Sequence, residues 1–129
     1  SIINKFLDLI KLETNSNNEK VKPFINEFEY YLGILKQFSE WIIQRAETNK
    51  DDVSAAANDY LKTLGYISLA FAWVKILNVS FKDYEENKKF YDDKINTAKF
   101  YFDKVLPRAE QHYKSAITGS SNIMNFQFN

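Results

Sequence analysis

The sequence predicts an all-α fold: an up-down antiparallel four-helix bundle followed by a C-terminal apolar tail. Aromatic residues make up 16% of the 129 residues, with only three Gly and two Pro, which favours long elements and few turns. Apolar residues recur at three- and four-residue spacings, as one face of a helix requires, and no alternating strand pattern persists. Short connections make neighbouring helices antiparallel. We expect one domain over residues 1–129, since this length can bury a core without disulfides or metal.

The first two helices are expected at residues 2 to about 12 and about 21 to 48. The turn-forming stretch NSNNE, from Asn15 to Glu19, separates them. Pro23 fits the first turn of the second helix, where its missing N–H costs little. The core stripe of the second helix has a clear helical period: Phe24, Phe28, Tyr31, Leu35, Phe38 and Ile42.

The third helix is expected from about residue 53 to 79, after a short loop and acidic cap in NKDD, from Asn49 to Asp52. The fourth begins at Asp83, or as late as Lys88, and ends at Thr118, with Gly119 as a left-handed C-cap. Interior Pro107 predicts a kink a few residues before it. The core stripe of the fourth helix is Tyr91, Ile95, Ala98, Phe102, Leu106, Ala109 and Tyr113.

The third helix has two apolar faces, because LGYISLAFAWVKIL, from Leu64 to Leu77, carries only two strongly polar side chains. At about 100° per residue, one face holds Tyr60, Leu64, Ile67, Phe71 and Val74, which suffice for a bundle core. The nearly opposite face holds Leu61, Gly65, Leu69, Ala72 and Ile76. We expect this helix to be central, with its second face covered by the apolar tail (Ile123, Met124, Phe126 and Phe128) or by another domain.

The candidate docking surface therefore comprises Leu61, Gly65, Leu69, Ala72, Trp73 and Ile76, together with Phe100 on the fourth helix and Tyr30, Ile34 and Trp41 on the second. Uneven packing within the bundle is the alternative explanation, since single exposed apolar residues are common. Gly65 is costly in mid-helix, so we expect a neighbouring backbone to approach it closely.

Composition argues against several classes of partner. The 17 basic and 17 acidic residues balance, so no strong field would collect nucleic acid or anionic lipid. A spanning helix needs about 20 mostly apolar residues, whereas Lys62 and Lys75 interrupt the apolar stretch. We expect no membrane span and a cytoplasmic location.

The residues indicate no catalytic, cofactor-binding or metal site in this chain. His112 is the only histidine, and the Glu-x-x-His pattern of dinuclear helical bundles is missing. A lone His among charged residues is most often a solvated side chain. Gly33, Gly65 and Gly119 are isolated from one another, so no glycine-rich phosphate loop forms. The chain alone is not expected to be an enzyme.

Two stretches, ANDYLKTLGYISLAFAWVKI (57–76) and FYDDKINTAKFYFDKVLPRAE (90–110), carry a family resemblance. They resemble the extra C-terminal helical domain of the larger acyl-CoA dehydrogenases. The shared pattern consists of Tyr60-Leu61, Gly65, Trp73, Phe90-Tyr91 with Lys94, Ala98-Lys99-Phe100-Tyr101, and Leu106-Pro107, with a similar close at Thr118-Gly119 and Ile123-Met124. The match covers the C-terminal half; upstream it depends on helix count and Trp41.

The resemblance implies a non-catalytic C-terminal accessory domain of a longer flavoenzyme. The parent enzyme would bind FAD and oxidise an acyl-CoA to the 2,3-enoyl-CoA. The family's catalytic glutamate and flavin-binding residues belong to preceding domains, so the implied partners are those domains and a second subunit. The alternative from another class is a free-standing bundle that binds a fatty acyl chain between its helices, because ligand pockets are mostly apolar.

Overall fold

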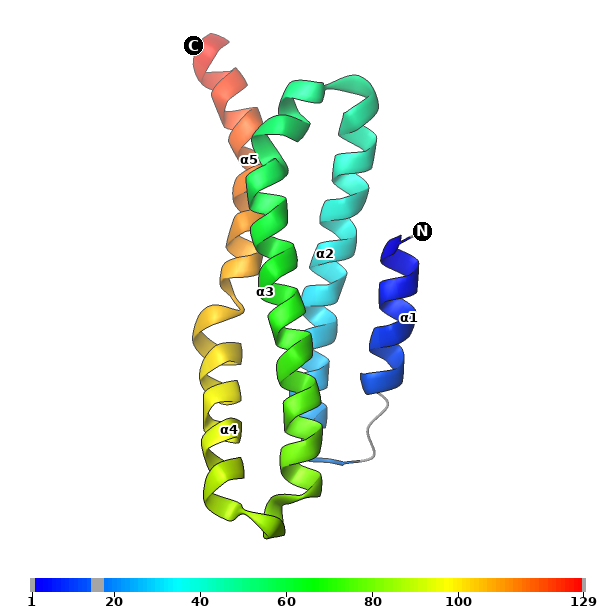
Figure 1. Ribbon diagram of the computed structural model, residues 1–129. Coiled ribbons are helices and arrows are strands. Elements are labelled where there is room, and N and C mark those ends of the chain that lie inside the picture. The colour runs from blue at the N-terminus through cyan, green and yellow to red at the C-terminus, as the bar shows by residue number, and fades with distance from the viewer. Residues whose placement is uncertain (1, 15–17, 129) are drawn as a thin grey trace.

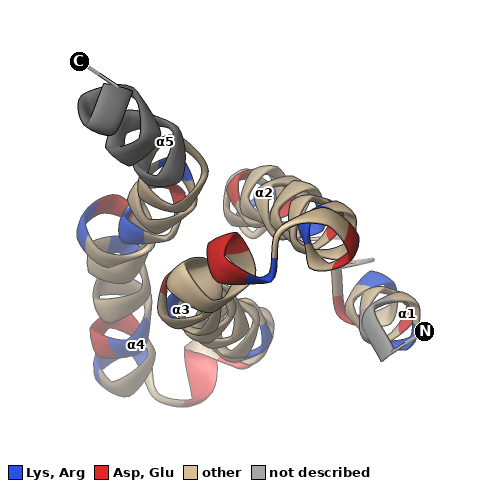
Figure 2. Cartoon of the chain, turned by 90° about the horizontal axis from the view of Figure 1, so that it is seen from above, with Lys and Arg blue, Asp and Glu red and all other residues tan. Residues whose placement is uncertain are grey.

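Helix α3 (Lys50–Lys82) lies at the centre of the molecule and contacts α1, α2, α4 and α5. The computed structural model describes the backbone of residues 2–14 and 18–128, and the side chains of residues 4–5, 7–14 and 18–118. Figure 2 shows α3 between α2 on one side and α4 and α5 on the other. The predicted central position of this helix is confirmed.

The described chain forms the predicted up-down bundle of helices (Figure 1). The fourth helix of the bundle is divided in two by a π-helical turn, and a short 3₁₀ turn precedes it. In chain order the elements are α1 (Ile2–Thr14), α2 (Lys22–Thr48), α3, the 3₁₀ turn (Tyr84–Glu86), α4 (Lys88–Phe100), the π turn (Tyr101–Val105) and α5 (Arg108–Phe128).

Asparagine side chains begin two of the helices. The side chain of Asn49 accepts a hydrogen bond from the N–H of Asp52 at 3.2 Å, and that of Asn87 accepts from the N–H of Phe90 at 3.2 Å. Each bond satisfies one of the N–H groups that a helix start leaves free. Helix α3 consequently begins at Lys50, three residues before the predicted start, and α4 begins at the later of the two predicted positions.

The kink predicted before Pro107 is present as the π turn, and Figure 1 shows the break between α4 and α5. Pro107 has no N–H to continue the helix and crowds the preceding turn. The N–H of Leu106 instead bonds to the carbonyl of Tyr101 at 2.8 Å, five residues back. The wider turn lets adjacent Tyr101 and Phe102 both be buried, although neighbouring residues of a regular helix diverge by about 100°.

The prediction that Gly119 ends the last helix is wrong, since α5 continues to Phe128. Glycine is compatible with right-handed helix as well as with a left-handed cap, and no proline follows to stop the helix. The side chains of the apolar tail, Ile123 to Phe128, lie outside the described residues, so their predicted role as a cover stays a prediction.

The core follows the predicted stripes on α2 and α4–α5, but on α3 it is rotated. Ile67 and Val74 are fully buried, whereas Tyr60, Leu64 and Phe71 are half-buried. The other buried positions of α3 are mostly small: Ala56, Thr63, Ala70, Leu77 and Ser80. The hydroxyls of Thr63 and Ser80 donate to backbone carbonyls four residues earlier, at 2.8 and 2.7 Å, which satisfies them inside the core.

Helix α3 is also long and apolar enough to cross a membrane by composition, with a mean hydropathy of 1.5 over its most apolar window. A central core helix passes the same test, and α3 contacts helices on several sides. Its composition is therefore weak evidence for a membrane span.

Candidate functional site

The face of α3 that points away from the core is apolar and uncovered by the described chain. We call this the outer face of α3. Its large members are all exposed: Leu61 (65%), Leu69 (53%), Ile76 (36%) and Val79 (50%). Gly65, Ser68 and Ala72 lie between them and are exposed. The outer face thus combines large side chains with gaps that would let another backbone come close.

An apolar depression lies at each end of the outer face of α3. The depression at the Leu61 end has a volume of about 350 Å³ and is lined by Ser39, Ile42, Ile43, Val53, Ala57, Tyr60 and Leu61. The depression at the Ile76 end has about 380 Å³ and is lined by Lys75, Ile76, Val79, Ser80, Phe90, Tyr91 and Lys94. Leu61 and Ile76 are roughly 22 Å apart along the helix, so a single docking partner could occupy both depressions.

Few charged side chains lie along the outer face of α3, and two lysines near it place their ammonium groups against aromatic rings. The Lys75 ammonium lies 4.7 Å from the centroid of the Phe71 ring, and the Lys94 ammonium lies 5.2 Å from that of Phe90. Such cation–π contacts hold a charge against a ring. Depletion of charge with large apolar and aromatic side chains is typical of the centre of a protein interface.

Three of the ten predicted docking residues pack within the bundle. Ile34 is buried, at 6% exposure, so its assignment to an exposed surface is wrong: that side of α2 faces the interior. Trp73 is half-buried against the core. Trp41 is also half-buried, packs against Phe38 with ring centroids 6.2 Å apart, and lies under Arg45.

Tyr30 and Phe100 are exposed but lie apart from the outer face of α3. The Tyr30 hydroxyl donates to the Glu110 carboxylate of α5 at 2.8 to 2.9 Å, so it lies along the contact between α2 and α5. That hydrogen bond to a carboxylate raises the pKa of Tyr30. Phe100 is 61% exposed and points nearly opposite to Ile95 and Ala98 around α4. The structure therefore unites only Leu61, Gly65, Leu69, Ala72 and Ile76 of the predicted set.

No close backbone approach occurs at Gly65 within the described chain. A Cβ built there would meet no atom within 4 Å, and the same holds for Gly33. The expectation of a close approach was wrong for the chain alone, because the outer face of α3 points away from the neighbouring helices. The open space beside Gly65 could therefore be filled only by residues outside the described chain or by another molecule.

Three residues that were not predicted also belong to this surface: Val79, Ile43 and Phe90. Val79 lies about five helical turns after Leu61 and so shares its direction, a signal that extending the helical pattern would have found. Ile43 and Phe90 join the surface through the depressions at its ends. Their inclusion depends on how α2 and α4 pack against α3, which periodicity within one helix does not specify.

His112 is partly buried and paired, which corrects the expectation of a solvated side chain. Its Nδ1 lies 2.8 Å from Oδ1 of Asp59, and its ring stacks on Tyr66 with centroids 5.9 Å apart. The side chains of His112 and Asp59 are 25% and 29% exposed. This pair links α5 to α3. Nucleophilic catalysis would also need a hydroxyl or thiol nucleophile bonded to the histidine, whereas the hydrogen-bond partner of His112 among the described residues is a carboxylate.

The described residues do not fit a flavin or metal site. The pyrophosphate of a dinucleotide is usually held by a glycine-rich turn at a helix start, whereas Gly33 and Gly65 both lie in helix interiors. Among the described side chains, at residues 4–5, 7–14 and 18–118, no group of three His, Cys, Asp or Glu could hold a metal ion.

Comparison with known protein families identifies a match over nearly the whole chain. A family model described as acetyl-CoA dehydrogenase C-terminal like matches residues 2–127. No curated protein and no solved structure matches the chain.

Proposed function

The chain belongs to the acetyl-CoA dehydrogenase C-terminal-like family, and we propose that it docks on the catalytic domains of an FAD-dependent acyl-CoA dehydrogenase through the outer face of α3. In this proposal the parent enzyme binds FAD and oxidises an acyl-CoA to the 2,3-enoyl-CoA. The chain contributes no catalytic or flavin-binding residue, and a second subunit is a further docking partner.

The observation that carries the proposal is the outer face of α3 with its two depressions. Removing a large apolar side chain from water stabilises a complex by about 1.5–3 kcal/mol when burial is complete. The side chains of Leu61, Leu69, Ile76 and Val79 are between 36% and 65% exposed, so each has on the order of 1 kcal/mol still to gain. Gly65 and Ala72 would allow a partner element to approach between them.

The depressions support a protein as the occupant of the outer face of α3. Binding energy at interfaces concentrates in a few large side chains that fill well-formed pockets. Two depressions separated by an apolar helix face would each receive one such side chain from the catalytic domains. Small-molecule sites, in contrast, are usually single concave pockets.

The proposal is tested with the chain and with its dehydrogenase catalytic domains produced as a separate polypeptide. The purified chain should lack the visible absorbance of flavin and should not oxidise acyl-CoA. On addition of the catalytic domains, hydrogen exchange should slow in the α3 segment 61–79 and in the segments that line the two depressions. Stoichiometric flavin in the isolated chain, or slowed exchange confined to other segments, would contradict the proposal.

A further inference from the structure

A groove with a volume of about 620 Å³ lies where the start of α2, the end of α3 and α4 meet. It shares no lining residue with either depression of the outer face of α3. Its volume is in the range of small-molecule sites, roughly 300–1,000 Å³. We call it the basic groove, because three lysines line it: Lys20, Lys82 and Lys99.

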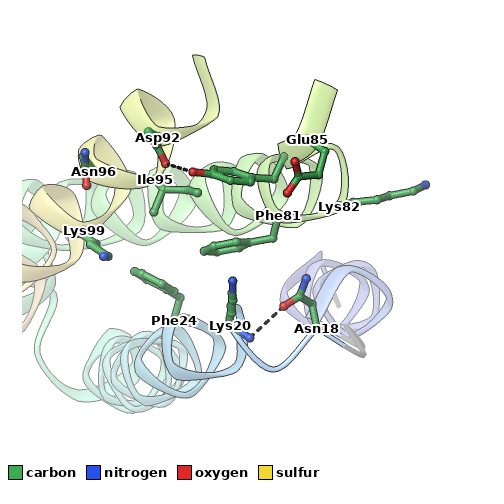
Figure 3. Close-up of a pocket in the computed structure, with 11 residues that line it drawn as sticks. Asn18, Lys20, Phe24, Phe81, Lys82, Glu85, Asp92, Ile95, Asn96 and Lys99 are labelled. Carbon is green, nitrogen blue, oxygen red and sulfur yellow. Dashed lines mark hydrogen bonds between the residues drawn. The ribbon is translucent and has the colours of Figure 1, made fainter. Parts of the chain in front are cut away.

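The floor of the basic groove is apolar and held in place by the core. Phe24, Phe81 and Ile95 line it, and Ile95 is buried. Phe24 packs edge-on against the buried ring of Phe102, with centroids 5.3 Å apart. Figure 3 shows the Phe24 and Phe81 rings on either side of the open space. An aliphatic or aromatic group would find preformed apolar contacts there.

Two of the lysines extend into this space. Figure 3 shows Lys20 and Lys99 beside the two phenylalanine rings, whereas Lys82 points away. The Lys20 ammonium lies 5.9 Å from the centroid of the Phe81 ring. No carboxylate of the described residues forms an ion pair with Lys20 or Lys99.

The two acidic residues of the groove are engaged by other partners. Asp92 accepts a hydrogen bond from the Tyr84 hydroxyl at 2.8 Å, and Glu85 pairs with Lys88 at 3.2 Å. The hydrogen bond to Asp92 also raises the pKa of Tyr84, which keeps the phenol protonated as a donor. The groove thus presents an apolar floor and two ammonium groups that no carboxylate of the described residues pairs with, and the carboxylates of Asp92 and Glu85 also belong to its lining.

We propose that the basic groove binds a small amphipathic carboxylate, with its anionic head at Lys20 and Lys99 and its apolar part between Phe24 and Phe81. Charge-assisted hydrogen bonds from ammonium to carboxylate are among the stronger polar contacts, and the rings bury the apolar part. The proposal does not depend on docking through the outer face of α3. It places a ligand in a surface groove, whereas the acyl-chain alternative of the sequence analysis placed one between the helices.

Isothermal titration of the full 129-residue chain with decanoate tests the proposal. Decanoate should bind saturably at one site, and decanol, which has the same chain without the charge, should bind much more weakly. Lys20→Met/Lys99→Met should weaken decanoate binding about tenfold or more, since it removes both charges and keeps apolar stems. Both lysines are exposed, so circular dichroism and Tm should stay unchanged.

The matched control is Lys36→Met/Lys62→Met, which removes the same charge from exposed positions outside the groove. It should bind decanoate as the unmodified chain does. No saturable binding, equal weakening by the two double variants, or equal affinity for decanol would overturn the proposal. Weaker binding of Lys20→Met/Lys99→Met to the dehydrogenase catalytic domains would also overturn the proposal, because the groove would then serve protein docking.

Discussion

Tyr101 joins two features of the fold, the π turn and a hydrogen bond between helices. The π turn buries its ring, and its hydroxyl donates to the backbone carbonyl of Tyr66 on α3. Burial, with a smaller contribution from the nearby Tyr66 phenol, raises the pKa of Tyr101 from 10.0 to about 12. The neutral phenol is therefore the form that the folded chain holds.

Tyr101→Phe should lower the free energy of unfolding at pH 7 by about 1 kcal/mol, the usual worth of one hydrogen bond. Between pH 10 and 12 the unfolded chain releases the Tyr101 proton while the folded chain retains it. The free energy of unfolding therefore falls as pH rises through this window. Urea unfolding across that range should show a shallower fall for Tyr101→Phe. Tyr91→Phe is the control, and an equal pH dependence in both variants would contradict this account.

Substitutions of Gly65 are expected to affect the stability of the isolated chain and its docking in different ways. Gly65→Ala should raise the free energy of unfolding of the isolated chain by up to about 1 kcal/mol, since alanine is the better helix former and a Cβ there meets nothing within 4 Å. Gly33→Ala should do the same for the same reason. Urea unfolding measures both, and destabilisation by Gly65→Ala would mean that an undescribed segment approaches the site.

A larger side chain in place of Gly65 is expected to weaken docking. Gly65→Leu should leave the fold stable but weaken binding to the catalytic domains, because it fills the gap between Leu61 and Leu69. Gly33→Leu, at an equally open helix position on α2, should not. Titration calorimetry with the catalytic domains measures the difference, and equal binding by the two variants would exclude Gly65 from the interface.

At the scale of elements, helix boundaries depend on caps as much as on periodicity. Residues with turn preferences marked the first two helix junctions in the sequence, and α2 was predicted to within one residue of its start. The start of α3 was placed too late because Asn49, the cap, occupies the whole connection. The kink before Pro107 was predictable, but its π form was not, since it depends on both Tyr101 and Phe102 reaching the core.

Asn49→Ala should lower the free energy of unfolding by about 0.5–2 kcal/mol, because it removes the side chain that caps α3. Asn58→Ala is the matched control: Asn58 is exposed within α3, where alanine should be neutral or stabilising. Urea unfolding at pH 7 compares them. Equal effects would show that the Asn49 side chain does not cap the helix.

At the scale of the whole molecule, the arrangement of helices decides which apolar residues stay uncovered. Helical periodicity within α3 was enough to predict its second face, because Leu61, Gly65, Leu69, Ala72 and Ile76 share one direction. It was not enough for Ile34, which is buried, because the rotation of α2 is set by its packing. The basic groove was also beyond prediction, since its lining comes from two stretches distant in sequence, residues 18–24 and 81–99, which meet only in the folded chain.

The outer face of α3 is the surface through which we propose that this chain docks on the catalytic domains of a dehydrogenase. The most direct test is calorimetric titration of the chain, carrying Leu69→Asp/Ile76→Asp, into the separately produced catalytic domains. Leu9→Asp/Leu12→Asp is the matched control, because Leu9 and Leu12 are 60% and 78% exposed on α1. Saturable binding of the unmodified chain and the control, with loss of at least about tenfold in affinity (1.4 kcal/mol) for Leu69→Asp/Ile76→Asp, is the predicted result. Equal affinity of both variants, or no binding by the unmodified chain, would contradict it.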